Sequence, residues 1–209
     1  MNKIIIAVWV LLVIGCNNAP ASGKAAIADK IIVDTMNDPS LVYREKASGG
    51  AAPKSPGELI GRIACKVKTK DLKEYEDGII PFISLDSTQK EIKQLIDKDN
   101  IVVPDKKVTI IIDYPLSSEH KFDVTSAGGF TRQQLVEAIS KEYHRIYEEE
   151  EATAKIKTLP LAKRKMYNRN QTDGKYGIWG HDLGDLVLDE ILIYKTEGGE
   201  IVLTLEIES

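Results

Sequence analysis

The sequence predicts an α+β fold, in which a small antiparallel sheet carries two helices packed on one side. Three observations predict this class. Short runs of alternating apolar and polar residues come in pairs separated by turn residues, which is typical of β-hairpins. Two longer stretches carry apolar residues three and four positions apart, as amphipathic helices do. The elements follow one another as ββ-α-ββ-α-loop-ββ, without the repeated crossover unit of a parallel α/β sheet.

The first pair of strands is expected at 62–69 and 79–85. In the first, Ile63, Cys65 and Val67 alternate with polar or small neighbours, so the Cys65 thiol is expected on the apolar face as an inert core group. The second strand contains a proline, which restricts it to a sheet edge or a strand start.

A first helix is expected from about 88 to 99. Thr88 and Glu91 have the spacing of a capping box, in which each side chain binds the backbone N–H of the other residue. Ile92, Leu95 and Ile96 form its apolar stripe.

A hairpin over 107–125 and a long helix follow. The first strand of the hairpin is apolar on both faces in its middle, which indicates a central strand. Thr131 and Gln134 predict a capping box at the start of the long helix. The expected core face of this helix consists of Leu135, Ala138, Ile139, Tyr143 and Ile146.

The acidic run 148–151 is interpreted as the solvated end of the long helix, because four adjacent carboxylates repel one another. A last hairpin is expected from strands 186–194 and 201–207, joined by a turn that contains Gly198 and Gly199.

The first sixteen residues have the form of an export signal. Lys3 precedes an uncharged apolar run from Ile4 to Ile14, which is shorter than the about 20 residues of a spanning helix. The run ends in Val13-Ile14-Gly15-Cys16, which resembles the lipobox of bacterial lipoproteins. The resemblance implies removal of residues 1–15, acylation of Cys16 and a lipid anchor in the cell envelope, in the outer membrane if the cell is Gram-negative.

The remaining chain divides into a tether and one domain. Residues 16–56 are rich in Gly, Pro, Ala and Ser and bury too little surface to fold alone, so they are expected to form a flexible tether. Two apolar patches, 31–33 and 41–43, leave open whether part of this tether joins the fold. Residues 57–209 are expected to form a single α+β domain.

The charge, the cysteine content and the missing motifs argue against several classes of protein and of functional site. The formal net charge is −4, which gives no global electrostatic reason to bind nucleic acid. With two cysteines, one of them in the lipobox, no intrachain disulfide framework is expected. The serine-hydrolase elbow, the zinc-protease motif and the phosphate-binding glycine loop are absent from the sequence, so it predicts no cofactor and no metal.

The segment 156–185 lacks a clear helix or strand pattern, and segments of this length inside a domain are often functional. It holds a cluster of glycines, aromatic residues and the densest basic run in the chain. Residues 173–183 also resemble a motif of an uncharacterised family, a resemblance that implies no activity.

Three interpretations of this segment stay open. In the first it is an ordered loop in which Trp179 plugs the core and His181 or Asp182 caps the turn before the next strand. In the second it binds an anionic or sugar ligand, because aromatic and cationic side chains suit such molecules. The residues for such a site are Tyr176, Trp179, Lys163, Arg164 and Arg169.

In the third interpretation the loop 173–185 serves catalysis or metal binding. The candidates are His181, Asp182 and Asp185, since His181 and Asp185 would share a face if this stretch were helical. The sequence thus favours an envelope lipoprotein with a non-catalytic binding domain that meets the membrane through Cys16, with an envelope protein or small ligand as partner. The alternative is an envelope hydrolase or metal-dependent enzyme.

Overall fold

A computed structural model describes residues 55–164 and 168–209. The predicted signal peptide, the lipobox and nearly all of the predicted tether lie outside the described residues. Within them the fold is α+β, with a multistranded sheet and two helices, as the sequence predicts. The strands are β1 (Glu58–Ala64), β2 (Val67–Lys68), β3 (Ile79–Ile80), β4 (Ile83–Ser84), β5 (Ile101–Val103), β6 (Lys107–Ile112), β7 (His120–Thr125), β8 (Phe130–Thr131), β9 (Val187–Lys195) and β10 (Ile201–Glu208).

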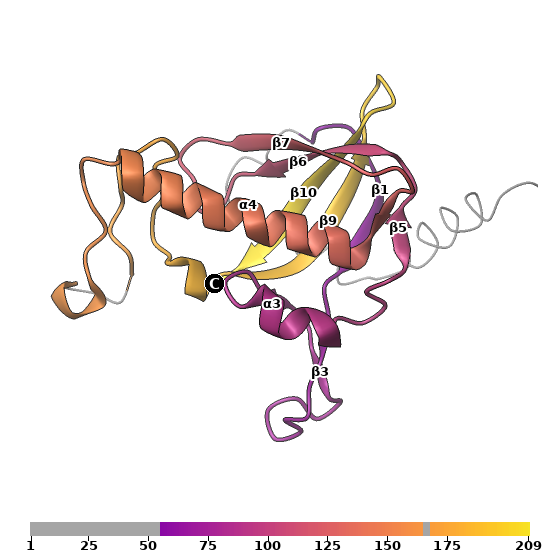
Figure 1. Cartoon of the computed structure of the whole chain (residues 1–209), viewed down its shortest axis with the longest axis horizontal. Coiled ribbons are helices and arrows are strands. Elements are labelled where there is room, and N and C mark those ends of the chain that lie inside the picture. The colour runs from indigo at the N-terminus through magenta and orange to yellow at the C-terminus, as the bar shows by residue number, and fades with distance from the viewer. Residues whose placement is uncertain (1–54, 165–167) are drawn as a thin grey trace, which may run out of the picture.

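The main sheet has six strands, so it is larger than the small sheet expected. Its order is β1-β9-β10-β6-β7, and β4 pairs with the other end of β9 (Figure 1). Both predicted hairpins are confirmed, since β6 pairs with β7 and β9 with β10 in antiparallel register. The β10 and β6 strands are parallel, however, so the expectation of a purely antiparallel sheet is wrong.

The element order also differs from the expectation, because proline and short turns divide the predicted strands. The predicted strand 62–69 is split into β1 and β2, and 79–85 is split into β3 and β4 around Pro81. Cys65 lies at the first break with its side chain fully buried, so its predicted place in the core is confirmed.

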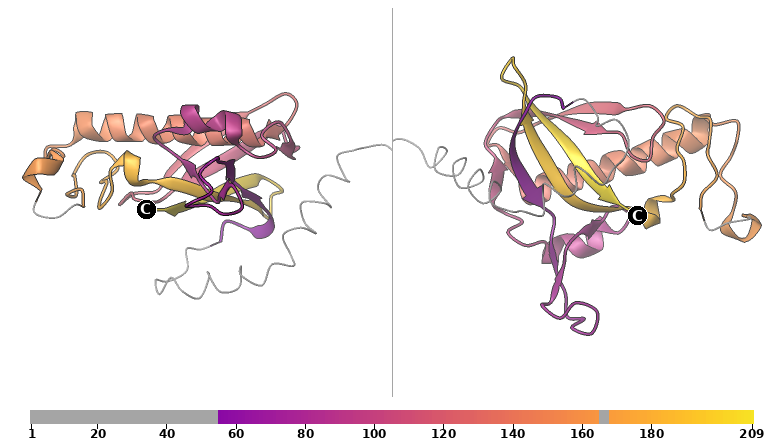
Figure 2. Two further views of the ribbon diagram at one scale, coloured as in Figure 1. Left: turned by 90° about the horizontal axis from the view of Figure 1, so that it is seen from below. Right: turned by 180° about the vertical axis from the view of Figure 1, so that it is seen from behind.

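The long helix α4 (Arg132–Thr153) covers one face of the sheet, and the short helix α3 (Thr88–Glu91) lies on the same side (Figure 2). The predicted capping box is confirmed: the Thr131 hydroxyl accepts from the Gln134 N–H, and the Gln134 side chain accepts from the Thr131 N–H. The buried face of α4 consists of Leu135, Val136, Ile139, Ser140, Tyr143, Ile146 and Glu150.

The first helix is shorter than predicted. It comprises α3 and a 3₁₀ turn, η1 (Ile92–Gln94), and Asp97 then takes a left-handed conformation with φ of 53°. The predicted capping box is wrong, because Thr88 already belongs to the helix and its hydroxyl donates to the Ser84 carbonyl. The Glu91 carboxylate instead accepts from the Ser84 N–H at 2.9 Å, which ties the helix to β4.

Candidate ligand site at the end of the long helix

The last turns of α4 meet the segment 154–186, which contains two 3₁₀ turns, η2 (Leu161–Lys163) and η3 (Leu183–Asp185). Figure 1 shows this segment as the orange and gold chain that leaves α4, projects from the body and returns to β9. The segment is therefore organised by contacts with the helix end rather than by regular secondary structure.

Glu150, in the last turn of α4, has no exposed surface and holds this segment in place. One carboxylate oxygen accepts from the Thr172 hydroxyl at 2.6 Å and the Gly174 N–H at 2.8 Å. The other accepts from the backbone N–H groups of Tyr176 at 2.7 Å and Gly177 at 3.1 Å. The interpretation of the acidic run as a solvated helix end is therefore wrong for Glu150.

The electrostatics of Glu150 follow from this cradle. Burial by itself would raise the pKa of the Glu150 carboxyl, but hydrogen bonds from the Thr172 side chain and three backbone N–H groups outweigh it and lower that pKa. These donors also stabilise a negative charge at a helix C-terminus, where the helix dipole opposes one. The Glu150 carboxylate thus holds residues 172–177 in a turn around its two oxygens.

Two glycines make the close approach possible. A Cβ on Gly174 would lie 2.7 Å from both the carbonyl oxygen and the carboxyl group of Glu150, which leaves no room for any side chain. Gly177 has φ of +65°, and a Cβ there would lie 2.9 Å from the Ser117 side chain. Two glycines of the cluster noted in the sequence, Gly174 and Gly177, therefore serve the cradle of Glu150.

A second carboxylate, Glu149, fixes the outer side of the same loop. It accepts from the Lys175 ammonium at 2.8 Å and the Tyr176 hydroxyl at 2.7 Å, and it pairs with Arg145. These hydrogen bonds lower the pKa of Glu149 to about 2. Tyr176 is buried between Glu149 and Glu150, so its ring does not form the exposed stacking surface that a ligand platform needs.

The prediction that Trp179 plugs the core is wrong, because its side chain is 39% exposed. The neighbouring Ile178 is fully buried and fills that place. The Trp179 ring meets Tyr114 edge-on, with 5.2 Å between ring centroids. The His181 ring contacts both, with its centroid 5.6 Å from that of Tyr114 and 6.1 Å from that of Trp179, and its Nε2 is 3.5 Å from the Ser209 hydroxyl.

The two aspartates proposed for catalysis make structural contacts. Asp182 is the N-cap residue of η3, as the first interpretation expects. Its carboxylate accepts hydrogen bonds from both terminal nitrogens of Arg164, at 2.6 and 3.1 Å. The Asp185 carboxylate accepts from the Asp182 N–H at 2.9 Å. Because η3 is a 3₁₀ turn of three residues, the helical spacing required for a His181–Asp185 metal pair does not form. Among the described residues no group of three or more His, Cys, Asp or Glu side chains could hold a metal.

The basic residues predicted to bind an anion have three different environments. Lys163 is exposed at the end of η2, and Arg164 is engaged by Asp182. Arg169 is 8% exposed, and its guanidinium carbon lies 5.1 Å from the centre of the Tyr147 ring. One terminal nitrogen, Nη1, is 3.6 Å from Asp182, while Nε and Nη2 are buried and have no hydrogen-bond partner within residues 55–164 and 168–209.

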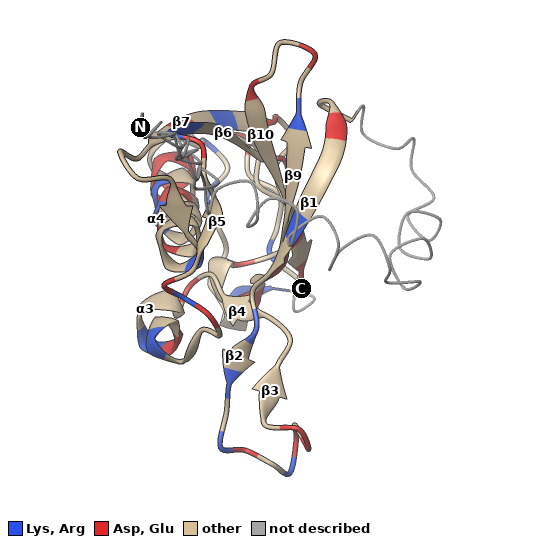
Figure 3. Cartoon of the chain, turned by 90° about the vertical axis from the view of Figure 1, so that its right-hand side faces the viewer, with Lys and Arg blue, Asp and Glu red and all other residues tan. Residues whose placement is uncertain are grey.

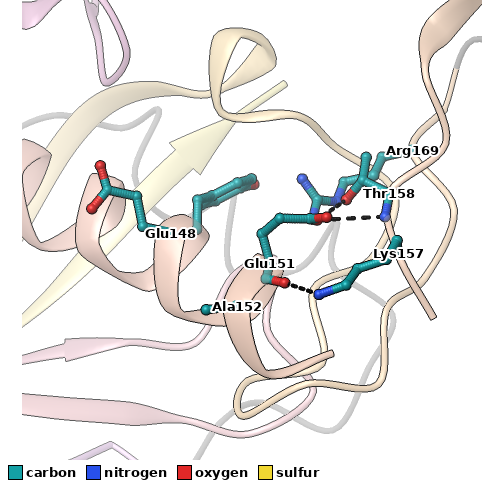
Figure 4. A pocket seen from close by; sticks show the side chains of 7 residues that line it. Glu148, Glu151, Ala152, Lys157, Thr158 and Arg169 are labelled. Carbon is teal, nitrogen blue, oxygen red and sulfur yellow. Dashed lines mark hydrogen bonds between the residues drawn. The ribbon is translucent and has the colours of Figure 1, made fainter. Parts of the chain in front are cut away.

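Arg169 also lines a shallow pocket of about 590 Å³ between α4 and the projecting segment. Figure 4 shows the side chains of α4 on one wall and those of the segment on the other. The lining residues are Tyr147, Glu148, Glu151, Ala152, Lys157, Thr158 and Arg169. Of the five ligand-binding residues predicted from the sequence, the structure places Arg169 alone in this pocket. The helix residues of its wall were missed, because nothing in the sequence indicates which face of α4 the segment meets.

Comparisons of the chain with protein-family models, with curated proteins and with solved structures find no match. No helix within the described ranges is long and apolar enough to cross a bilayer. The lipid anchor at Cys16 stays a prediction from the lipobox resemblance, and the resemblance of residues 173–183 to an uncharacterised family finds no support in these comparisons.

Proposed function

We propose that this chain is a membrane-anchored lipoprotein of the bacterial cell envelope, whose domain binds a small anionic molecule in the Arg169 pocket without transforming it. One observation carries the ligand site: a buried arginine in the pocket wall has two N–H donors that find no acceptor in the part of the chain that the structure describes. Buried donors are ordinarily paired, because an unpaired one loses its hydration without compensation.

The geometry of the unpaired edge defines the ligand group. The Nε and Nη2 donors of a guanidinium point in parallel and suit the two oxygens of a carboxylate or a phosphate. Asp182 lies beside Nη1, so the Nε and Nη2 edge of Arg169 is the one without an acceptor among the described residues. Tyr147 supports the guanidinium face, so the side chain is already ordered before the ligand arrives. Both nitrogens are closed to water in the unliganded fold, so binding requires a small movement of the pocket wall.

The remaining lining residues restrict the charge and the polar groups that a ligand can carry. Glu148 and Glu151 stand on the helix wall and disfavour a molecule with several negative charges. Thr158 and Lys157 face them from the loop, with Lys157 donating to the backbone carbonyl of Glu151 (Figure 4). A ligand with one carboxylate or phosphate, and with hydroxyl or ammonium groups toward Glu148 and Glu151, fits this distribution of charge.

The proposed ligand site is tested by measuring whether anionic ligands stabilise the protein against unfolding. Glucuronate and glucose 6-phosphate should raise the urea midpoint of unfolding and glucose should not, since a ligand at a hundred times its Kd adds about 2.7 kcal/mol. Arg169→Lys keeps the charge but removes the fork and should abolish the effect. Arg132→Lys is the matched control, because Arg132 also has a buried unpaired Nε but lies outside this pocket. Equal stabilisation by glucose, or an unchanged response in Arg169→Lys, would contradict the proposal.

The anchor is tested separately. Mass spectrometry of the protein from its own membranes should show a chain that begins at Cys16 and carries acyl groups, and Cys16→Ala should leave the detergent phase. A mature chain that keeps Met1, or a Cys16→Ala variant that still partitions into detergent, would refute the lipoprotein assignment.

A further inference from the structure

The segment that closes the pocket also presents an exposed apolar surface. Within six residues, Ile156, Leu159 and Leu161 are 55%, 43% and 58% exposed. They account for half of the large hydrophobic side chains that are exposed in the described parts of the chain. Figures 1 and 2 show the turn that contains η2 at the far end of a loop that projects beyond α4. Clustered exposed apolar residues of this kind mark a contact surface.

The backbone of this loop is held by specific hydrogen bonds, so the exposed side chains are not the result of a loose chain. The Asp173 carboxylate accepts from the N–H groups of Lys155 and Ile156 at 2.8 and 2.7 Å. The Asn170 side chain accepts from the Leu159 N–H at 2.8 Å, and Arg164 donates to the Leu159 carbonyl at 2.7 Å. The loop therefore presents its aliphatic side chains to solvent in an ordered conformation.

The segment that carries these side chains is basic in sequence. Residues 152–172 contain six Lys and Arg and no Asp or Glu, although the whole chain has a net charge of −4. Lys155 and Lys163 are exposed on either side of the aliphatic group. The neighbouring carboxylates of Glu151, Asp173 and Asp182 are engaged by hydrogen-bond donors of the loop itself. Exposed aliphatic side chains flanked by exposed lysines combine the two attractions that hold proteins at a negatively charged bilayer surface.

We propose that residues 155–164 form a membrane-contact loop, which places Leu159 and Leu161 in the interface of a bilayer that contains anionic lipid. This goes beyond the ligand site and does not depend on it. The lysines would lie at the headgroups, and their aliphatic stems would extend the apolar surface. Pro160 separates the two leucines in a short tip, a shape that fits insertion between headgroups better than a flat protein interface does.

The contact is compatible with an anchor at Cys16. The 38 residues from Asn17 to Lys54 reach at most about 130 Å when fully extended, at about 3.4 Å per residue. Helix α4, whose C-terminal end carries the loop, has 22 residues and is about 33 Å long. The connecting chain is therefore long enough for the anchor and the loop to meet the same membrane.

Vesicle cosedimentation tests the contact independently of acylation, on a chain of residues 17–209 that lacks Cys16. We expect binding to vesicles of phosphatidylcholine and phosphatidylglycerol, and at least tenfold weaker partitioning to phosphatidylcholine alone. The double variant Leu159→Ser/Leu161→Ser should lower partitioning to the anionic vesicles at least tenfold. Lys155→Glu/Lys163→Glu should do the same.

The β2–β3 hairpin provides matched controls. Leu72 there is 61% exposed, but Lys70, Asp71, Lys73 and Glu74 around it mix both signs of charge (Figure 3). Leu72→Ser and Lys70→Glu/Lys73→Glu should change partitioning less than twofold. Because all these positions are exposed, the variants are expected to keep the wild-type unfolding midpoint, which verifies that they fold.

Three outcomes would overturn the proposal. The first is failure of the wild-type chain to bind the anionic vesicles. The second is an equal loss in the hairpin controls. The third is a loss on lysine substitution without one on leucine substitution, which would show that the loop is attracted to the headgroups without inserting its leucines. A Leu159→Trp variant gives a second readout, because its emission should shift to the blue with anionic vesicles while that of Leu72→Trp should not.

Discussion

Replacing Glu150 by glutamine is expected to destabilise the protein far more than any other charge removal in the acidic run. Glutamine keeps one oxygen, which preserves two of the four hydrogen bonds that the carboxylate accepts. Its NH₂ group faces the two remaining donors and repels them. Glu150, Thr172 and Tyr176 are buried and the two glycines are half-buried, and in such an environment an unpaired donor is costly.

The magnitude is set by the two bonds lost. A hydrogen bond to a charged acceptor contributes about 1.5–3 kcal/mol, so two of them amount to about 3–6 kcal/mol. Relief of a negative charge at the C-terminus of a helix returns about 0.3–1 kcal/mol. We therefore expect Glu150→Gln to lower the free energy of unfolding by about 2–6 kcal/mol. Glu148→Gln, at an exposed position of the same run, should change it by less than about 0.5 kcal/mol.

Urea denaturation of the two variants measures this difference, and hydrogen exchange locates it. The amides of Gly174, Tyr176 and Gly177 should lose protection in Glu150→Gln, because they donate to that carboxylate. If Glu150→Gln unfolds within about 0.5 kcal/mol of the wild type, and these three amides exchange as before, the carboxylate does not organise the loop.

Burial and charge predict the response of other groups to pH, truncation and labelling. The pKa values of Glu149 and Glu150 are lowered below the usual 4.5, that of Glu149 to about 2, so the stabilisation from both carboxylates is complete above pH 4.5 and is lost as the pH falls through these lowered values. Urea midpoints measured from pH 7 to pH 2.5 should therefore decline only below about 4.5. Trp179→Ala should cost about 1 kcal/mol and Ile178→Ala about 2–5 kcal/mol in chemical denaturation, and the reverse ranking would contradict the observed burial. Burial raises the pKa of the Cys65 thiol, so a maleimide should modify it only in denaturant, and rapid labelling of the native protein at pH 8 would show that it is accessible.

The elements that the sequence predicts well are those set by local pattern. The capping box of Thr131 and Gln134 and the apolar stripe of α4 depend on residues within one or two turns of each other. The two confirmed hairpins likewise join strands that follow one another in the chain. The parallel pairing of β6 with β10 joins residues about ninety positions apart, and no local pattern carries that information.

The candidate site is predicted less well, for the same reason. The partners of Glu150 lie 22 to 27 positions further along the chain, so its burial leaves no trace in the helical pattern. Trp179 and Ile178 are neighbours in the chain, yet Ile178 is buried and Trp179 is exposed. Side-chain size and hydrophobicity alone predict Trp179 as the buried residue, which is wrong. Arg169 is identified among the basic residues, but its unpaired edge depends on how Asp182 and Tyr147 surround it.

The Nε–H resonance of Arg169 reports directly on whether its fork receives an anionic ligand group, which is the central proposal for this domain. In protein labelled with ¹⁵N and titrated with glucuronate, this signal should shift in a saturable way. The Nε–H of Arg132, which is also buried and unpaired, should stay in place. An Arg169 signal that does not move at high glucuronate concentration, or equal and unsaturable shifts of both arginines, would contradict the proposal.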